Sequence, residues 1–286
     1  MSEVTHANAL RGAEFRKLLG KPKTWIVIVI CSLVMAACGL IIGPVFALGL
    51  FVVTFLVGIA ITFSMADSRA AQGFYEAYAD YRGLTLWPGG KSLGGETPLL
   101  RKGDKQRVEA MFEGMLSPEI EGKLALFTFI VESRDSKGNK TEVNYPFTIV
   151  LFNLPEAIQS LRELRVQRKS GFKALEKFED TFRRDHERVT LESEAMRDRY
   201  EIFVGKQEDP VFVRRLFSPS FIVWLTESPP EKFAFELENG WLCAYVPKHR
   251  DSIEGFDEII EVGTIVTARI KEEILQTSPD TEGERS

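Results

Sequence analysis

Cysteine and histidine are both scarce in this chain, with three of each in 286 residues. Cys31 and Cys38 lie in one apolar stretch and Cys243 lies far from both, so there is no disulfide framework and no CxxC pair. No histidine has a partner at metal-ligand spacing. These absences exclude the common disulfide and zinc scaffolds, and we expect no metal and no cofactor.

Charge is missing from one long stretch. Residues 24–66 include no Asp, Glu, Lys, Arg or His, a run of 43 residues. As a helix the run would be about 65 Å long, roughly twice the ~30 Å of a hydrocarbon core. Gly43-Pro44 interrupts it, because proline breaks a continuing helix. The sequence predicts a transmembrane hairpin at 24–64 with spans 24–42 and 45–63; buried core helices or a re-entrant hairpin are the alternatives.

Lysine and arginine are distributed unevenly around this stretch. Five precede it, none lies in the turn between the spans, and Arg69 and Arg82 follow. The positive-inside rule therefore places both termini and the soluble part in the cytoplasm. Residues 1–23 are predicted to form a basic amphipathic segment, helical over 9–19, that lies on the anionic inner leaflet. A disordered basic tail is the alternative.

The part of the chain beyond the apolar stretch has the length of a soluble domain. It carries a net charge of about −8 within the total of −5, which argues against nucleic acid as a partner because nucleic-acid binding needs a basic face. Residues 65–103 are predicted to be a juxtamembrane helix and a Gly/Pro-rich linker, 104–275 the domain, and 276–286 a disordered tail.

Within the domain the hydrophobic period changes along the chain. Residues 104–116 have apolar side chains at helical spacing and predict an amphipathic helix. Two apolar runs around the turn cluster 135–139 predict a β-hairpin, and further short runs predict more strands. Helices are expected at 171–184, on either side of Pro219, and after Ser252. The predicted fold class is an α+β soluble domain with a mixed or antiparallel sheet, preceded by a two-helix transmembrane hairpin.

Three segments carry a resemblance to known proteins: VTLESEAMRDRYEIFVGKQEDPVFVRRLFSPSFIVWL, FAFELENGWLCAYVP and FYEAYADYRGL. Together they resemble a family of uncharacterised bacterial membrane proteins with one or two N-terminal transmembrane helices and a cytoplasmic α+β domain. The resemblance implies an integral protein of the bacterial inner membrane. It implies no activity, because the shared patterns include no reactive residue.

Two short motifs look like active-site sequences. PGGKS at 88–92 resembles the end of a phosphate-binding loop, but Thr85 stands where that loop needs its first glycine. His249-Arg250-Asp251 spells the HRD of a kinase catalytic loop, but Phe256 stands where the metal-binding Asn should be. We interpret both as chance matches.

A basic run is the most functional-looking surface feature. This run consists of Arg162, Arg165, Arg168, Lys169 and Lys173. It is a candidate contact for anionic lipid or for an acidic partner. A solvated face balanced by nearby glutamates is the alternative. The aromatic residues of the C-terminal third, Trp241 among them, are interpreted as core rather than as a ligand platform.

The sequence favours a membrane-anchored, non-enzymatic binding or scaffold domain whose partners are the lipid bilayer and either another protein or further copies of the chain. Two alternatives remain. One is a subunit of a larger membrane complex. The other is a tethered enzyme with a site assembled from Arg134, Asp135, His186 and His249.

Overall fold

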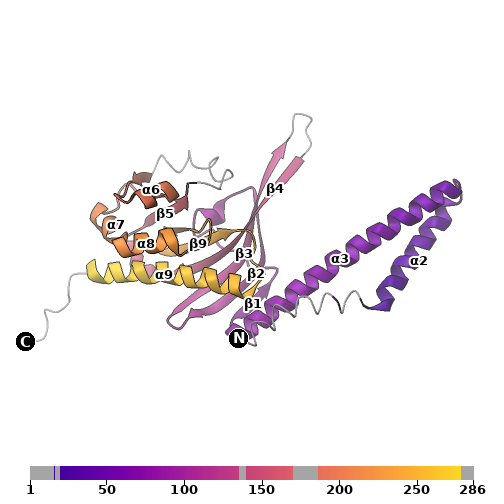
Figure 1. The fold of residues 1–286 in the computed structure, drawn as a ribbon, viewed down its shortest axis with the longest axis horizontal. Coiled ribbons are helices and arrows are strands. Elements are labelled where there is room, and N and C mark those ends of the chain that lie inside the picture. The colour runs from indigo at the N-terminus through magenta and orange to yellow at the C-terminus, as the bar shows by residue number, and fades with distance from the viewer. Residues whose placement is uncertain (1–15, 17–19, 135–139, 170–185, 278–286) are drawn as a thin grey trace, which may run out of the picture. The chain divides into compact units, whose positions relative to one another are not determined.

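The chain forms two compact units, Met1–Arg82 and Gly83–Ser286, which are described separately. The computed structural model describes residues 16, 20–134, 140–169 and 186–277 (Figure 1). The predicted helices at 9–19 and 171–184 and most of the predicted tail lie outside these residues.

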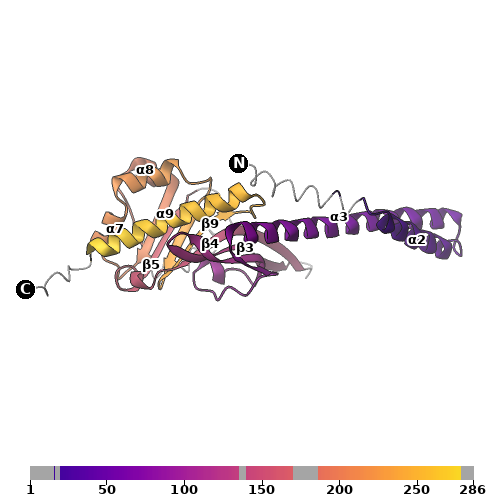
Figure 2. The same ribbon diagram turned by 90° about the horizontal axis from the view of Figure 1, so that it is seen from below.

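The described part of the first unit contains two antiparallel helices, α2 at Pro22–Gly39 and α3 at Pro44–Arg82. Figure 2 shows α2 running beside the first half of α3. The helices approach closely at glycines: a Cβ on Gly39 would stand 2.7 Å from the Cα of Ala47, and one on Gly58 would stand 2.9 Å from Ile28. A larger residue at either position would push the two helices apart.

Only one helix among the described residues is long and apolar enough to cross a membrane, namely Pro44–Thr62. The apolar part of α2, Trp25–Gly39, is shorter than that requirement. The predicted span 45–63 therefore coincides with a candidate membrane helix, whereas the two-span hairpin stays a prediction. The predicted continuation of the second helix is confirmed, because α3 extends without a break to Arg82.

The second unit is built on one sheet of nine strands in the order β1-β2-β3-β4-β9-β8-β5-β7-β6, with every neighbouring pair antiparallel. An α+β domain with an antiparallel sheet is thus confirmed. The strands are β1 Thr85–Pro88, β2 Lys105–Ser117, β3 Ile120–Arg134, β4 Lys140–Asn153, β5 Glu163–Arg168, β6 His186–Val189, β7 Tyr200–Gly205, β8 Ala234–Glu238 and β9 Trp241–Pro247.

Two predictions for the start of this unit are wrong. Residues 104–116 are not a helix but most of β2, and part of the predicted linker is β1. Val108 pairs with Phe127 while Met111 pairs with Ala125, so three steps along β2 match two along β3. This β-bulge stretches the two-residue period of a strand into a three-residue step, which imitates the spacing of a helix.

One face of the sheet is covered by helices, which are α6 Glu194–Arg199, α7 Pro210–Leu216, α8 Pro219–Glu227 and α9 Ile253–Thr277. Figure 1 shows α9 running along the sheet. It lies so close to β4 that a Cβ on Gly263 would stand 2.5 Å from Val150. The predicted break at Pro219 is confirmed, and so is the start of α9, where the Gly255 N–H donates to the hydroxyl of Ser252 at 3.1 Å.

The other face is covered by the connection between β1 and β2, which includes the 3₁₀ turn η1 at Leu99–Arg101. Leu93, Leu99 and Leu100 from this connection join a buried cluster with side chains of β2, β3, β4 and β9. Cys243 and Tyr245 of β9 belong to this cluster, whereas Ala244 between them faces α9. The sheet therefore has two separate hydrophobic layers.

Candidate functional site

A charged pair lies inside the second unit. Arg165 of β5 stands opposite Glu236 of β8, which stands opposite Cys243 of β9. The side chains of Arg165 and Glu236 are 4% and 1% exposed, and 3.5 Å separates Nη2 of Arg165 from Oε2 of Glu236. The other carboxylate oxygen accepts the backbone N–H of Leu99 at 2.5 Å. The pair therefore fixes η1 to the sheet.

The reactive-looking side chains beside this pair are held neutral. Burial raises the pKa of the Cys243 thiol well above its ordinary value, and the charge of Glu236 raises it further. Burial likewise raises the pKa of the Tyr245 hydroxyl. Because the thiolate is the nucleophilic form, Cys243 has the properties of a structural cysteine. This interior cluster therefore organises the fold.

The predicted basic run does not form a single face. Arg162 and Lys169 are exposed, but they flank opposite ends of β5, about 23 Å apart at ~3.3 Å per residue. Arg165 is buried in its pair with Glu236. Arg168 lies with its guanidinium carbon 4.6 Å from the ring centroid of Tyr200. Lys173 lies outside the described residues.

The residues of the alternative enzyme site are likewise not brought together. Arg134 is exposed at the end of β3. Nε2 of His186 lies 2.8 Å from a carboxylate oxygen of Glu163 near the far edge of the sheet. Nδ1 of His249 lies 3.2 Å from a carboxylate oxygen of Glu109 on β2, and six strands of the sheet lie between β2 and β6, the strand of His186. Asp135 lies outside the described residues.

The described residues also include no group of three or more His, Cys, Asp or Glu side chains that could hold a metal ion. At the PGGKS motif, Gly89 and Gly90 have φ of 69° and 67° and form a tight turn after β1. A Cβ on Gly90 would stand 2.4 Å from that of Val108, so this glycine is needed for packing.

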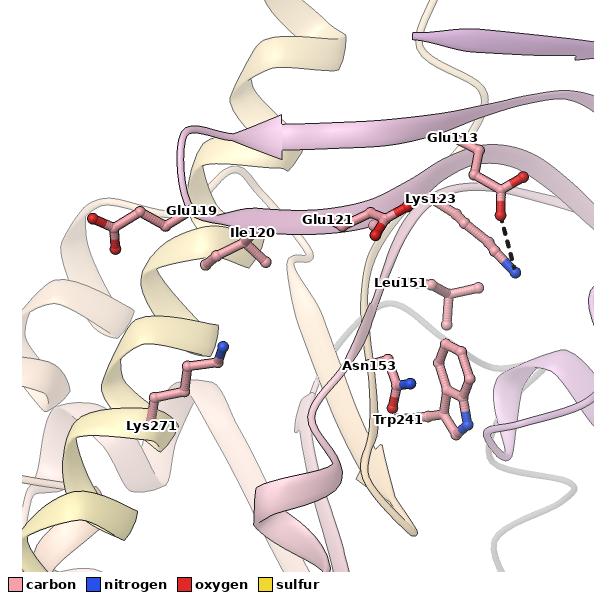
Figure 3. Close-up of a pocket in the computed structure, with 10 residues that line it drawn as sticks. Glu113, Glu119, Ile120, Glu121, Lys123, Leu151, Asn153, Trp241 and Lys271 are labelled. Carbon is pink, nitrogen blue, oxygen red and sulfur yellow. Dashed lines mark ion pairs between the residues drawn. The ribbon is translucent and has the colours of Figure 1, made fainter.

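An open groove of about 400 Å³ lies at one end of the sheet. It is bordered by the β2–β3 hairpin, the end of β4, the start of β9 and one turn of α9 (Figure 3). We call it the Trp241 groove, and its lining consists of Glu113, Glu119, Ile120, Glu121, Gly122, Lys123, Leu151, Asn153, Trp241 and Lys271.

A tight turn places Trp241 at the groove. Asn239 and Gly240 connect β8 to β9 with φ of 48° and 81°, the conformation of a type I′ hairpin turn. Trp241 is thus the first residue of β9, directly opposite Asn153 of β4. Because side chains alternate along a strand, its indole lies on the same face as the thiol of Cys243. It is half-buried and lies beside Leu151 and Asn153 in Figure 3.

The acidic side of the groove comes from the β2–β3 hairpin. Ser117 pairs with Ile120, so Pro118 and Glu119 form a two-residue turn. Glu119 and Glu121 are exposed, and among the described residues neither has an ion-pair partner.

The two lysines of the groove are both engaged. Nζ of Lys123 lies 3.7 Å from Oε1 of Glu113 and 5.8 Å from the ring centroid of Trp241. Glu113 also accepts a hydrogen bond from the indole N–H of Trp87 at 3.1 Å. Nζ of Lys271 lies 3.2 Å from a carboxylate oxygen of Glu156, outside the groove. Glu119 and Glu121 therefore set the sign of the local field.

The groove is absent from the sequence-based predictions. Trp241 is predicted to be a core residue, but it is only half-buried, whereas Phe233, Phe235 and Tyr245 are buried. The Asn-Gly pair before Trp241 was an available signal, since it marks a hairpin whose next residue begins a strand. The pairing of Glu113 with Lys123 depends on the strand that was mistaken for a helix.

Comparisons with known proteins do not assign this chain to a family. No protein-family model and no curated protein matches the chain. Among solved structures, a crystal structure of the mycobacterial trehalose monomycolate transport factor A, TtfA, is 11% identical with a TM-score of 0.36; the match covers 72% of this chain and 95% of that one. The resemblance to a family of bacterial membrane proteins stays a prediction.

Proposed function

We propose that this chain is a membrane-anchored, non-enzymatic binding protein of the bacterial inner membrane. In this proposal α2 and α3 cross the lipid as a hairpin, and the α+β unit stands in the cytoplasm. The Trp241 groove is its ligand site.

The exposure of apolar side chains on α3 carries the proposal. Only 6% of the candidate span Pro44–Thr62 is buried. Val53 and Leu56 are both 58% exposed, and Leu48 is 66% exposed. In water, leaving a side chain of this size exposed costs about 1.5–3 kcal/mol relative to burying it. A lipid environment removes that cost and explains why no charge occurs over residues 24–66.

The composition of the groove supports binding. Its lining combines one indole face with an amide, carboxylates and ammonium groups around an open space, so it offers both an apolar surface and polar groups that can orient a ligand. The neighbouring Cys243, the one described cysteine of this unit, is buried and neutral.

Cysteine labelling tests the anchoring. Cys31 and Cys38 are replaced by serine, and the buried Cys243 is kept. One exposed cysteine is then introduced per variant, by Ile41→Cys in the turn between the helices or by Thr141→Cys at the start of β4. A membrane-impermeant maleimide is applied to spheroplasts before and after lysis. We expect Ile41→Cys to react in intact spheroplasts and Thr141→Cys to react only after lysis.

Three results would contradict the proposed anchoring or its orientation. Reaction of Thr141→Cys in intact spheroplasts would place the α+β unit outside the cytoplasm. Release of the full-length chain from membranes by alkaline carbonate would show that α2 and α3 do not cross the lipid. Reaction of both cysteines only after lysis would also exclude a hairpin that reaches the far side.

A further inference from the structure

We propose that the Trp241 groove recognises an organic cation, namely an alkylammonium or guanidinium group on a polyamine or on a basic peptide segment, a refinement that rests on the proposed function above. Three observations carry it. The groove has an aromatic face, its unpaired charges are negative, and one of its own lysines already occupies the position of such a ligand.

The field in the groove favours a positive guest. Lys123 is paired with Glu113, and Lys271 is paired with Glu156 outside the groove. The exposed carboxylates of Glu119 and Glu121 are left to attract a cation and to repel an anion. A phosphate or carboxylate ligand would be repelled by both carboxylates, and no lysine of the groove would be free to pair with it, because Lys123 and Lys271 are already paired.

Trp241 offers the matching apolar surface. Cations bind over indole faces within about 6 Å of the ring centroid. Nζ of Lys123 lies 5.8 Å from this ring, at the outer limit of that range. The amide of Asn153, directly opposite Trp241 in the sheet, can accept an N–H of the same guest.

Lys123 therefore acts as an internal competitor. It is paired with the carboxylate of Glu113 (Figure 3), and its ammonium group lies at the outer limit of contact with the Trp241 ring, so an incoming ammonium group must displace it or share those contacts. Replacing Lys123 by methionine keeps the length and apolar stem of the side chain but removes its charge. A cation should then bind more tightly, whereas an anion that used Lys123 would bind more weakly.

The experiment is calorimetric titration of the full-length protein in a neutral detergent, with empty micelles subtracted. The probes are spermidine, a short arginine-containing peptide, maltose as a neutral ligand and citrate as an anion. We expect spermidine or the peptide to bind, with Lys123→Met strengthening binding roughly 3- to 30-fold and Trp241→Leu weakening it by a similar factor. Glu121→Gln should weaken binding several-fold.

Matched variants separate the site from net charge. Lys105→Met removes the same charge from an ion pair with Glu132 and Glu142, and Glu187→Gln neutralises an exposed carboxylate on β6. Both should leave the affinity for the cation unchanged within about twofold at 0.15 M salt, where distant charges are screened. Trp241→Leu can weaken binding by lowering the stability of the fold. The effects of Lys123→Met and Glu121→Gln therefore decide whether the cation binds in the groove.

The possible results are distinguishable. Weaker cation binding in Lys123→Met, equal effects of Glu121→Gln and Glu187→Gln, or no heat with either cation would overturn the inference. Trp241-dependent binding of maltose or citrate without the cations would also overturn it, yet would leave the groove as a ligand site. The difference in affinity between spermidine and the peptide shows which source of the cation the groove prefers.

Discussion

The two units treat apolar and charged side chains in opposite ways. Along the Pro44–Thr62 part of α3 the large apolar residues lie outside, as Val53 and Leu56 do, and no charge occurs between residues 24 and 66. In the α+β unit the large apolar residues lie inside, and even a charged pair, Arg165 with Glu236, is buried. The exposure of apolar side chains therefore cannot be interpreted in the same way in both units. The sheet unit buries its apolar side chains as a domain in water does, whereas the candidate span Pro44–Thr62 exposes them, as the proposed lipid environment would favour.

The largest expected effect comes from the buried charge. Glu236→Ala removes the carboxylate that Arg165 and the Leu99 N–H share, which leaves two polar groups in an apolar interior. We expect a loss of about 3–5 kcal/mol in the free energy of unfolding, the usual cost of breaking a buried ion pair. Urea denaturation of the purified protein, followed by circular dichroism, measures it.

Glu238→Ala is the control for that change. Glu238 lies two residues further along the same strand and pairs with Arg101, whose side chain is 48% exposed. Its loss should cost about 1 kcal/mol or less, because exposed pairs contribute little. Equal losses in the two variants would show that the burial of the Arg165–Glu236 pair has no energetic consequence.

A second prediction compares the same substitution in both units. Val53 in the middle of the candidate span and Val223 in α8 are similarly exposed, at 58% and 53%. Val53→Lys should raise the cost of membrane insertion by about 3 kcal/mol, because a lysine at the centre of a span meets hydrocarbon. Val223→Lys should change stability by less than about 0.5 kcal/mol, because its side chain meets water.

The fraction of each variant that resists carbonate extraction, relative to the unchanged chain, provides the measurement. Val53→Lys is expected to reduce the resistant fraction and Val223→Lys to leave it as it was. If both variants behave alike, the exposed surface of α3 is not a lipid-facing surface.

Sequence patterns predicted those parts of the fold that depend on neighbours along the chain. The hairpin of β3 and β4, the break at Pro219 and the start of α9 after Ser252 each depend on a short turn, a proline or a cap. The patterns failed at β2, because the bulge after Val108 gave a strand the spacing of a helix.

The groove could not be predicted, because it depends on strand register. Trp241 meets Asn153 only because β9 pairs with β4, about ninety residues earlier in the chain. Lys123 meets Glu113 only through the pairing of β2 with β3. The described members of the basic run do not share one face for a related reason. A strand sends alternate side chains to opposite faces, so neighbouring arginines cannot form one continuous surface.

The smallest expected effect distinguishes the units by their response to acid. Residues 24–66 have no carboxylate or histidine, whereas Glu109 of β2 pairs with His249 in the α+β unit. Oε2 of Glu109 lies 3.2 Å from Nδ1 of His249, and Oε1 lies 3.3 Å from Arg107. On the other side of the ring, Nε2 lies 3.1 Å from the carbonyl oxygen of Phe127.

The hydrogen bond from His249 holds the pKa of Glu109 below its ordinary value of 4.5. A depressed carboxyl pKa stabilises the folded state at pH values above the unfolded pKa, and the contribution disappears as the pH falls through the folded pKa. Because Glu109 is 39% exposed, we expect only about 0.2–1 kcal/mol. Glu109→Gln should therefore lower the urea midpoint at pH 6 and have a much smaller effect near pH 3.

Glu187→Gln, at an exposed position on β6, serves as the reference for this measurement, since it should not change the midpoint at either pH. A Glu109→Gln difference of the same size at pH 6 and pH 3 would mean that the His249 contact does not stabilise the ionised carboxylate. Residues 24–66 of α2 and α3 have no carboxylate or histidine, so their helical structure in micelles should be the same at both pH values, and the acid response would come from other parts of the chain.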